Sequence, residues 1–155
     1  MKRIIVVVVS VLLASNCLTY ADDQAFGNVK LADAKGKQAE AKLIFSDSNK
    51  SLVVRVSDHD LVAIPYENVD KLSYEYTKKH RITTGAVVMI FSLGAGAVVM
   101  LTKSKSNWFY IDYHDQDAKK TVVLKLEKKD LQKIFDASKT HTGKEVINLG
   151  NAGKG

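Results

Sequence analysis

The sequence contains one cysteine, Cys17, and one proline, Pro65, among its 155 residues. A lone cysteine cannot form a disulfide within the chain, so a folded domain must depend on its hydrophobic core. Common catalytic motifs are also missing: there is no Gly-x-Ser-x-Gly or His-Glu-x-x-His, and no Lys-Ser or Lys-Thr comes directly after Gly94-Ala95-Gly96 to close a phosphate-binding loop. We therefore predict a protein that is not an enzyme and has no cofactor.

The four histidines are scattered along the chain. The one cluster with the residue types of a metal site is His114-Asp115-Gln116-Asp117. It falls in a predicted hairpin turn, where polar side chains usually face solvent. We therefore interpret the cluster as solvent-exposed side chains and predict no metal site.

Positive charge exceeds negative charge only mildly, with 23 lysines and arginines against 17 acidic residues. The lysines are interspersed with acids, as Lys119 and Lys120 are with Asp115 and Asp117. A nucleic-acid-binding protein usually concentrates its basic residues on one face or stripe. We therefore predict no nucleic-acid partner.

The N-terminus has the features of a secretory signal peptide. Lys2 and Arg3 precede an apolar stretch from Ile4 to Ala14, and Thr19-Tyr20-Ala21 is a small-x-small cleavage site. The apolar stretch is short for a membrane span, which makes an uncleaved N-terminal anchor the weaker alternative. We predict that residues 1–21 are removed and that the protein is exported to the periplasm or cell envelope.

Cys17 offers an alternative, because a cysteine after an apolar export segment can become the lipid-modified first residue of a bacterial lipoprotein. Asn16 stands where such signals normally have Gly or Ala. Cleavage after Ala21 is therefore favoured over lipidation. It discards Cys17 and leaves the mature chain without a cysteine.

Most of the mature chain has the pattern of antiparallel β-strands, with polar turns between alternating apolar residues. The period changes near the C-terminus, where Leu131, Ile134 and Phe135 fall on one helical stripe and Gly143 provides a stop. The predicted strands are 39–45, 52–56, 61–64, 69–76, 108–113 and 121–126, followed by a helix at 128–140 and a short extended piece at 146–147.

The segment from Leu61 to Tyr74, which includes Ile64-Pro65-Tyr66, resembles the strand, Ile-Pro-Tyr, turn and strand passage of bacterial pleckstrin-homology-like and GRAM-like domains. The resemblance covers roughly residues 38–147. It implies a mainly β fold, a small bent antiparallel barrel with one C-terminal helix that plugs one end. It does not carry over a phosphoinositide site, because the first hairpin loop, 46–51, has one lysine and one acid. The flanking segments are then a lead-in at 22–37 and a disordered Gly-rich tail at 148–155.

Residues 82–102 form a stretch of 21 residues without a charge, inside the predicted domain. As a helix this stretch, which we call the apolar segment, would reach about 30 Å, the thickness of a bilayer's hydrocarbon core. A single crossing, however, would separate strands that must share one core. We therefore predict a hairpin that dips into one leaflet. The alternatives are burial of the segment as core or an oligomer interface, and a true membrane span.

The expected function is that of a non-enzymatic envelope protein, a binding or scaffolding module whose partners are a membrane lipid surface and a protein that the sequence does not identify. Self-association through the apolar segment is an expected corollary. The predicted headgroup contacts are Lys78, Lys79, Arg81, Lys103 and Lys105, and the predicted membrane contacts are Val87, Val88, Met89, Ile90, Phe91, Leu93, Val98, Val99, Met100 and Leu101.

Overall fold

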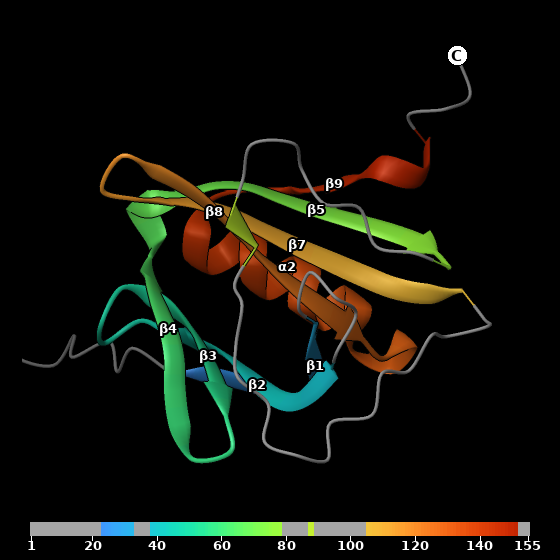
Figure 1. Cartoon of the computed structure of the whole chain (residues 1–155), viewed down its shortest axis with the longest axis horizontal. Coiled ribbons are helices and arrows are strands. Elements are labelled where there is room, and N and C mark those ends of the chain that lie inside the picture. Colours follow the sequence, from blue (N-terminus) through green and yellow to red (C-terminus); the bar gives the residue numbers. More distant parts are fainter. Residues whose placement is uncertain (1–22, 33–37, 79–86, 89–104, 152–155) are drawn as a thin grey trace, which may run out of the picture.

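A computed structural model describes residues 23–32, 38–78, 87–88 and 105–151 of the chain. In this part the strands form one curved sheet in the order β4-β3-β2-β1-β8-β7-β5-β9, and β6 pairs with β8 off this path. The helix α2 packs against the sheet (Figure 1). The strands are β1 (Gln24–Ala32), β2 (Gln38–Ser46), β3 (Ser51–Val56), β4 (His59–Pro65), β5 (Val69–Thr77), β6 (Val87–Val88), β7 (Ser106–Asp115), β8 (Ala118–Leu126) and β9 (Val146–Asn148); the helices are η1 (Tyr66–Asn68), η2 (Lys128–Asp130), α2 (Leu131–Thr142) and η3 (Leu149–Asn151).

Strand β1 joins the two halves of the sheet, because it pairs with β2 along one edge and with β8 along the other. Its register with β2 shifts between Phe26 and Val29, at the Gly27-Asn28 pair. An irregularity of this kind bends a strand and increases its twist. The sheet can therefore curve around a core rather than remain flat.

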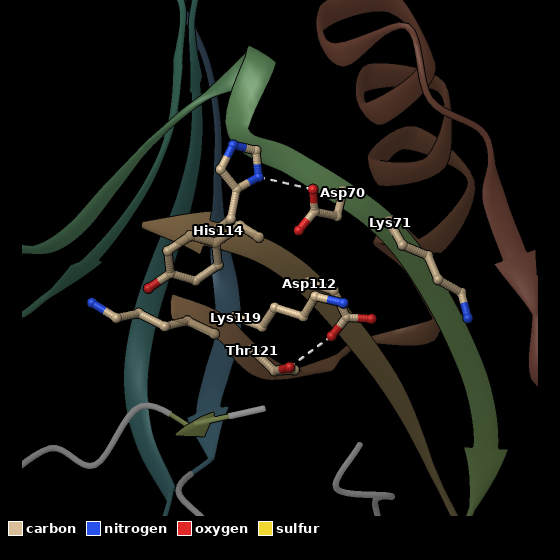
Figure 2. Close-up of a pocket in the computed structure, with 8 residues that line it drawn as sticks. Asp70, Lys71, Asp112, His114, Lys119 and Thr121 are labelled. Carbon is tan, nitrogen blue, oxygen red and sulfur yellow. Dashed lines mark hydrogen bonds and ion pairs between the residues drawn. The ribbon is translucent and has the colours of Figure 1, made fainter. Parts of the chain in front are cut away.

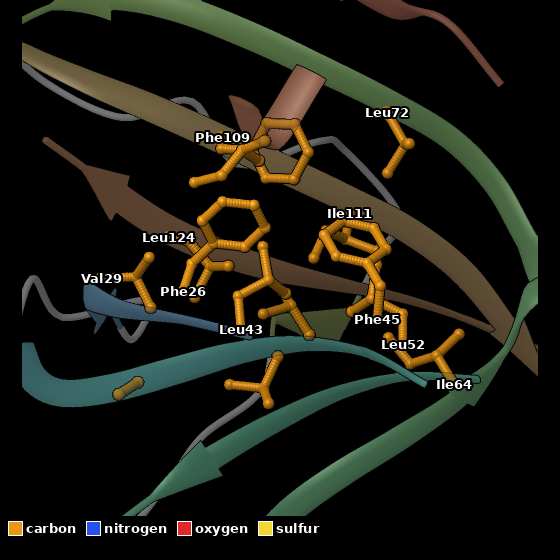
Figure 3. Packing of buried hydrophobic residues seen from close by; sticks show 14 of the residues in the cluster. Phe26, Val29, Leu43, Phe45, Leu52, Ile64, Leu72, Phe109, Ile111 and Leu124 are labelled. Atoms are coloured by element: carbon orange, nitrogen blue, oxygen red, sulfur yellow. The ribbon is translucent and has the colours of Figure 1, made fainter. Parts of the chain in front are cut away.

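Large apolar side chains from most of the strands fill the concave side of the sheet (Figure 3). Phe45 of β2, Phe109 of β7 and Leu124 of β8 are fully buried there. Helix α2 closes this core with Ile134, which is also fully buried, and with Phe135, whose ring centroid lies 6.3 Å from that of Phe109. The predicted fold class, a mainly β open barrel with a C-terminal helix, is confirmed.

The predicted C-terminal helix is present, but its bounds differ from the predicted 128–140. The α-helix begins at Leu131 after the short 3-10 turn η2, and it ends at Thr142. Gly143 has the left-handed backbone conformation, with φ of 71°, and its N–H donates to the carbonyl of Lys139 at 3.0 Å. Glycine adopts this conformation without the steric cost of a Cβ atom, which explains the stop.

Two boundary assignments were wrong. The stretch 22–37 is not simply a lead-in, because it contains β1, whose alternation is interrupted by the Gly27-Asn28 irregularity. The tail does not begin at residue 148, because β9 extends to Asn148 and η3 continues to Asn151. Strand β9 runs parallel to β5, with Val146 opposite Leu72. Three residues carry too little periodicity to predict such a distant pairing.

One short part of the apolar segment is described. Val87 and Val88 form β6, which pairs in parallel with Lys120 and Thr121 of β8. Strand β1 leaves β8 at the pair of Ala32 with Val123, so β6 occupies the edge that β1 leaves open. Within the described ranges, no helix combines the length and apolar character needed to cross a bilayer.

We predict that Leu124→Ala lowers the free energy of unfolding by about 2–5 kcal/mol, because it removes a fully buried side chain from the centre of the core and leaves a cavity. Urea denaturation followed by the fluorescence of Trp108, the single tryptophan, measures this change. Lys125→Ala on the same strand serves as the matched control and is expected to change stability far less. Equal loss in both variants would contradict the assigned core.

Candidate functional site

The described structure has two candidate binding sites. One is a charged groove at the β7–β8 turn, and the other is at the opposite end of the same strands, where the apolar segment is attached. The groove has a volume of about 520 Å³ (Figure 2). It is lined by Asp70, Lys71, Asp112, Tyr113, His114, Lys119, Lys120 and Thr121.

The acidic groups of this groove are already engaged. His114 Nδ1 lies 2.8 Å from Asp70 Oδ1, and Thr121 Oγ1 donates to Asp112 Oδ1 at 2.6 Å. The Lys120 ammonium pairs with Asp115. In the described ranges no three His, Cys, Asp or Glu side chains gather as metal ligands would. The turn residues of the predicted polar cluster, Gln116 and Asp117, are exposed.

Another histidine connects the end of α2 to the first hairpin. His141 Nδ1 lies 2.7 Å from Asp47 Oδ1, and the imidazole stacks on Phe45 with ring centroids 5.4 Å apart. Tyr66 also donates its hydroxyl to Asp47, at 3.4 Å. The hydrogen bond from His141 is the main cause that lowers the pKa of Asp47, whereas burial is the main cause that raises the pKa of Tyr66. These contacts hold the helix against the β2–β3 turn, which is a structural role.

The apolar segment is attached at the opposite end of the β5–β7 pair. Thr77, at the end of β5, pairs with Ser106, at the start of β7. The chain between them therefore leaves and re-enters the sheet at one place, which we call the neck and define as Tyr76, Lys78 and Lys105. All three are exposed, Tyr76 to 56%. The Lys105 ammonium lies 5.8 Å from the centre of the Tyr76 ring, within the range of a cation–π contact.

A second groove opens beside the neck, between β5, β7, β9 and the start of α2. We call it the neck groove. Its volume is about 650 Å³, and the described residues that line it are tyrosines, amides and two lysines among others, with no carboxylate. The lining residues are Tyr74, Tyr76, Lys105, Asn107, Lys128, Leu131, Asn148 and Gly150.

Hydrogen bonds fix the inner wall of the neck groove. The Tyr74 hydroxyl donates to Asn107 Oδ1 at 2.8 Å, and burial raises the pKa of Tyr74. Asn148 Oδ1 accepts from the Gly150 N–H at 3.0 Å, which leaves the amide nitrogen of that side chain as a donor. The groove therefore presents hydrogen-bond donors and positive charge.

The aromatic strand β7 is buried on both faces. Phe109 belongs to the main core, while Trp108 and Tyr110 join Ala32 and Val123 in a second cluster on the other face of the sheet. Trp108 is 2% exposed and Tyr110 is 3% exposed. This face is therefore not an open stacking surface for bases or sugars.

Part of the predicted membrane-contacting set lies within the described residues. Lys78 and Lys105 flank the pair of Thr77 with Ser106 at the neck, and Val87 and Val88 lie at the β8 edge. Outside the described residues lie Lys79, Arg81, Lys103, Met89, Ile90, Phe91, Leu93, Val98, Val99, Met100 and Leu101.

Comparison with known proteins supports the fold and nothing more specific. No protein-family model matches the sequence, and a search of curated proteins finds no match. Among solved structures, the chain is similar to one described as the structure of the Spt16D Pob3N heterodimer, with a TM-score of 0.51 and 10% sequence identity. The match covers 87% of this chain but 58% of the other. Together with the strand order and the C-terminal helix, it shows a pleckstrin-homology-like open barrel.

Sequence reasoning missed the neck groove and the contact between His141 and Asp47. Lys128, Asn148 and Tyr74 come from three elements that are distant in the sequence, and none belongs to a recognisable motif. One signal was present in the sequence: Tyr74 and Tyr76 are two residues apart on β5, so their side chains lie on the same face of the strand.

We predict that Asp47→Asn lowers stability by about 1 kcal/mol near pH 6, because the His141 hydrogen bond loses its charged acceptor. A lowered carboxyl pKa stabilises the fold above about pH 4, and this contribution is lost as pH falls through the lowered value. The difference between wild type and variant in urea midpoints should therefore shrink toward pH 2.5. Asp58→Asn, at an exposed turn, is the control; a gap that does not depend on pH would contradict this role for Asp47.

Proposed function

We propose that the chain is a non-enzymatic, exported envelope protein, in which a pleckstrin-homology-like barrel serves as a binding or scaffolding module held at a membrane by the apolar segment. The observation that carries this proposal is the pairing of Thr77 with Ser106. This pairing places the two strand ends that flank the long charge-free segment side by side on one folded domain. The barrel can then remain whole on one side of a bilayer while the segment contacts lipid.

The composition of the neck supports the same arrangement. Lysines at the base of an apolar segment suit anionic headgroups, and an exposed tyrosine suits the boundary between headgroups and hydrocarbon. Tyr76, Lys78 and Lys105 meet at this base. The pairing of Thr77 with Ser106 disfavours a single crossing, because one crossing would place these two paired residues on opposite sides.

A second candidate is a soluble periplasmic protein in which the apolar segment is part of the core or of an oligomer interface. The pairing of Val87 and Val88 with β8 favours it, because these residues belong to the segment and hydrogen-bond to the sheet. Washing isolated membranes distinguishes the two candidates, because the wash releases a soluble protein but not one held in lipid by an apolar segment.

We predict that the protein stays in the pellet when membranes are washed with alkaline carbonate, because an apolar segment in lipid is not held by charge. Leu93→Asp combined with Val98→Asp should shift it to the soluble fraction. Ile147→Asp, which changes an exposed apolar residue of the barrel, is the control and should not. Release of the wild-type protein by the wash would favour the soluble candidate.

We further predict that residues before and after the apolar segment are accessible from the same side. Lys71→Cys and Asp117→Cys place single thiols at exposed positions on β5 and in the β7–β8 turn. In a Cys17→Ser background, a membrane-impermeant maleimide should label both in cells with a permeabilised outer barrier. Labelling of one position alone would contradict the same-side arrangement.

A further inference from the structure

The two charged grooves at opposite ends of the β5–β7 pair differ in one chemical respect. The groove at the β7–β8 turn contains Asp70 and Asp112, whereas none of the described residues that line the neck groove carries a carboxylate. Lys105 and Lys128 supply two positive charges to the neck groove. The nearest acid in sequence to Lys128 is Glu127, and it pairs with Lys129 at 3.0 Å.

Three hydrogen-bond donors of the neck groove have no polar partner among the described residues. Tyr74 and Asn107 bond to each other and form the wall, while the Asn148 amide nitrogen and the two lysine ammonium groups make no ion pair or hydrogen bond recorded among the described residues. Each of these groups donates and none of them accepts. Donors of this kind bind the oxygens of a phosphate group, and none of the three groups carries a negative charge that would repel it.

We infer that the neck groove binds the phosphate of an anionic membrane lipid, with Lys105, Lys128 and Asn148 as the groups that contact it. This inference rests on the proposed function, because it assumes that the neck faces a membrane. Lys105 immediately follows the apolar segment and its basic flank, so a segment that reaches lipid places the groove at the depth of the headgroups.

The apolar part of the lining fits the remainder of such a lipid. Tyr74, Tyr76 and Leu131 are among the residues that line it. These side chains offer apolar surface to a glycerol backbone and to the first carbons of its chains, while the lysines meet the phosphate. The volume of about 650 Å³ lies in the range of small-molecule sites. The predicted ligand is therefore a phosphodiester lipid with net negative charge.

Vesicle flotation tests the inference with the full chain synthesised in the presence of vesicles. Wild type should bind phosphatidylglycerol-containing vesicles more strongly than vesicles of phosphatidylcholine alone, and the preference should weaken with salt. Lys105→Gln combined with Lys128→Gln should reduce binding to the anionic vesicles by roughly tenfold. Lys71→Gln combined with Lys119→Gln removes the same charge from the other groove and is expected to have a much smaller effect.

A second pair of variants distinguishes binding in the groove from nonspecific electrostatic attraction to the vesicle. Asn148→Asp adds a carboxylate inside the groove and keeps the acceptor for the Gly150 N–H, so it should weaken anionic binding. Gln116→Glu adds the same charge at the exposed β7–β8 turn and should not. Equal effects within either matched pair would overturn the groove as the site. Urea denaturation confirms that each variant folds.

The source of the phosphate is tested with soluble probes and amide NMR spectra of the full chain in mild detergent. Glycerophosphoglycerol should shift the signals of Asn107 and Asn148, and inorganic phosphate should not compete with it at equal concentration. Saturation by inorganic phosphate alone would overturn the lipid assignment. Equal flotation of wild type with both vesicle types would overturn the groove but not the membrane function, whereas no flotation with either would count against the membrane function itself.

Discussion

The ladder between β5 and β7 is the constraint on which the rest of the structure depends. It pairs Thr77 with Ser106 across an insertion that contains the whole apolar segment. The entropic cost of closing a loop grows only slowly with its length, so an extended antiparallel ladder between packed strands can sustain such an insertion. Because the ladder holds, the domain keeps one core and the segment must begin and end at the same edge.

The consequences of this ladder extend to both ends of the strands. At the turn end, Asp70 bonds to His114, Asp112 accepts from Thr121 and Lys120 pairs with Asp115. At the neck, the same two strands bring Tyr76 and Lys105 together, and the described lining there contains no acid. The 3-10 turn η2 adds Lys128, helix α2 adds Leu131 from its start, and β9 adds Asn148. The difference in charge between the two ends is thus produced by the way in which these elements converge.

Much of the fold was predictable because its signals are local. Alternating apolar residues specified the strands, and Gly143 specified the end of the helix, since each pattern is set by neighbouring residues along the chain. Strand β1 was missed because the Gly27-Asn28 irregularity breaks its alternation, and β9 because it is short and parallel. Of the residues that line the neck groove, the sequence singled out Lys105 as a membrane-facing lysine but not Lys128 or Asn148, because these come from distant parts of the chain.

The sequence by itself determined the length of the apolar segment, its basic flanks, the export signal that we expect and the alternation of most strands. Each of these properties depends on residues that are consecutive in the sequence. Only the tertiary structure decided that Thr77 and Ser106, on either side of the segment, are neighbours, that β6 lies on β8 and that no acid is among the described residues that line the neck groove. Each of these depends on pairing between residues far apart in the chain, which is selected by the burial of a common core and not by any local pattern.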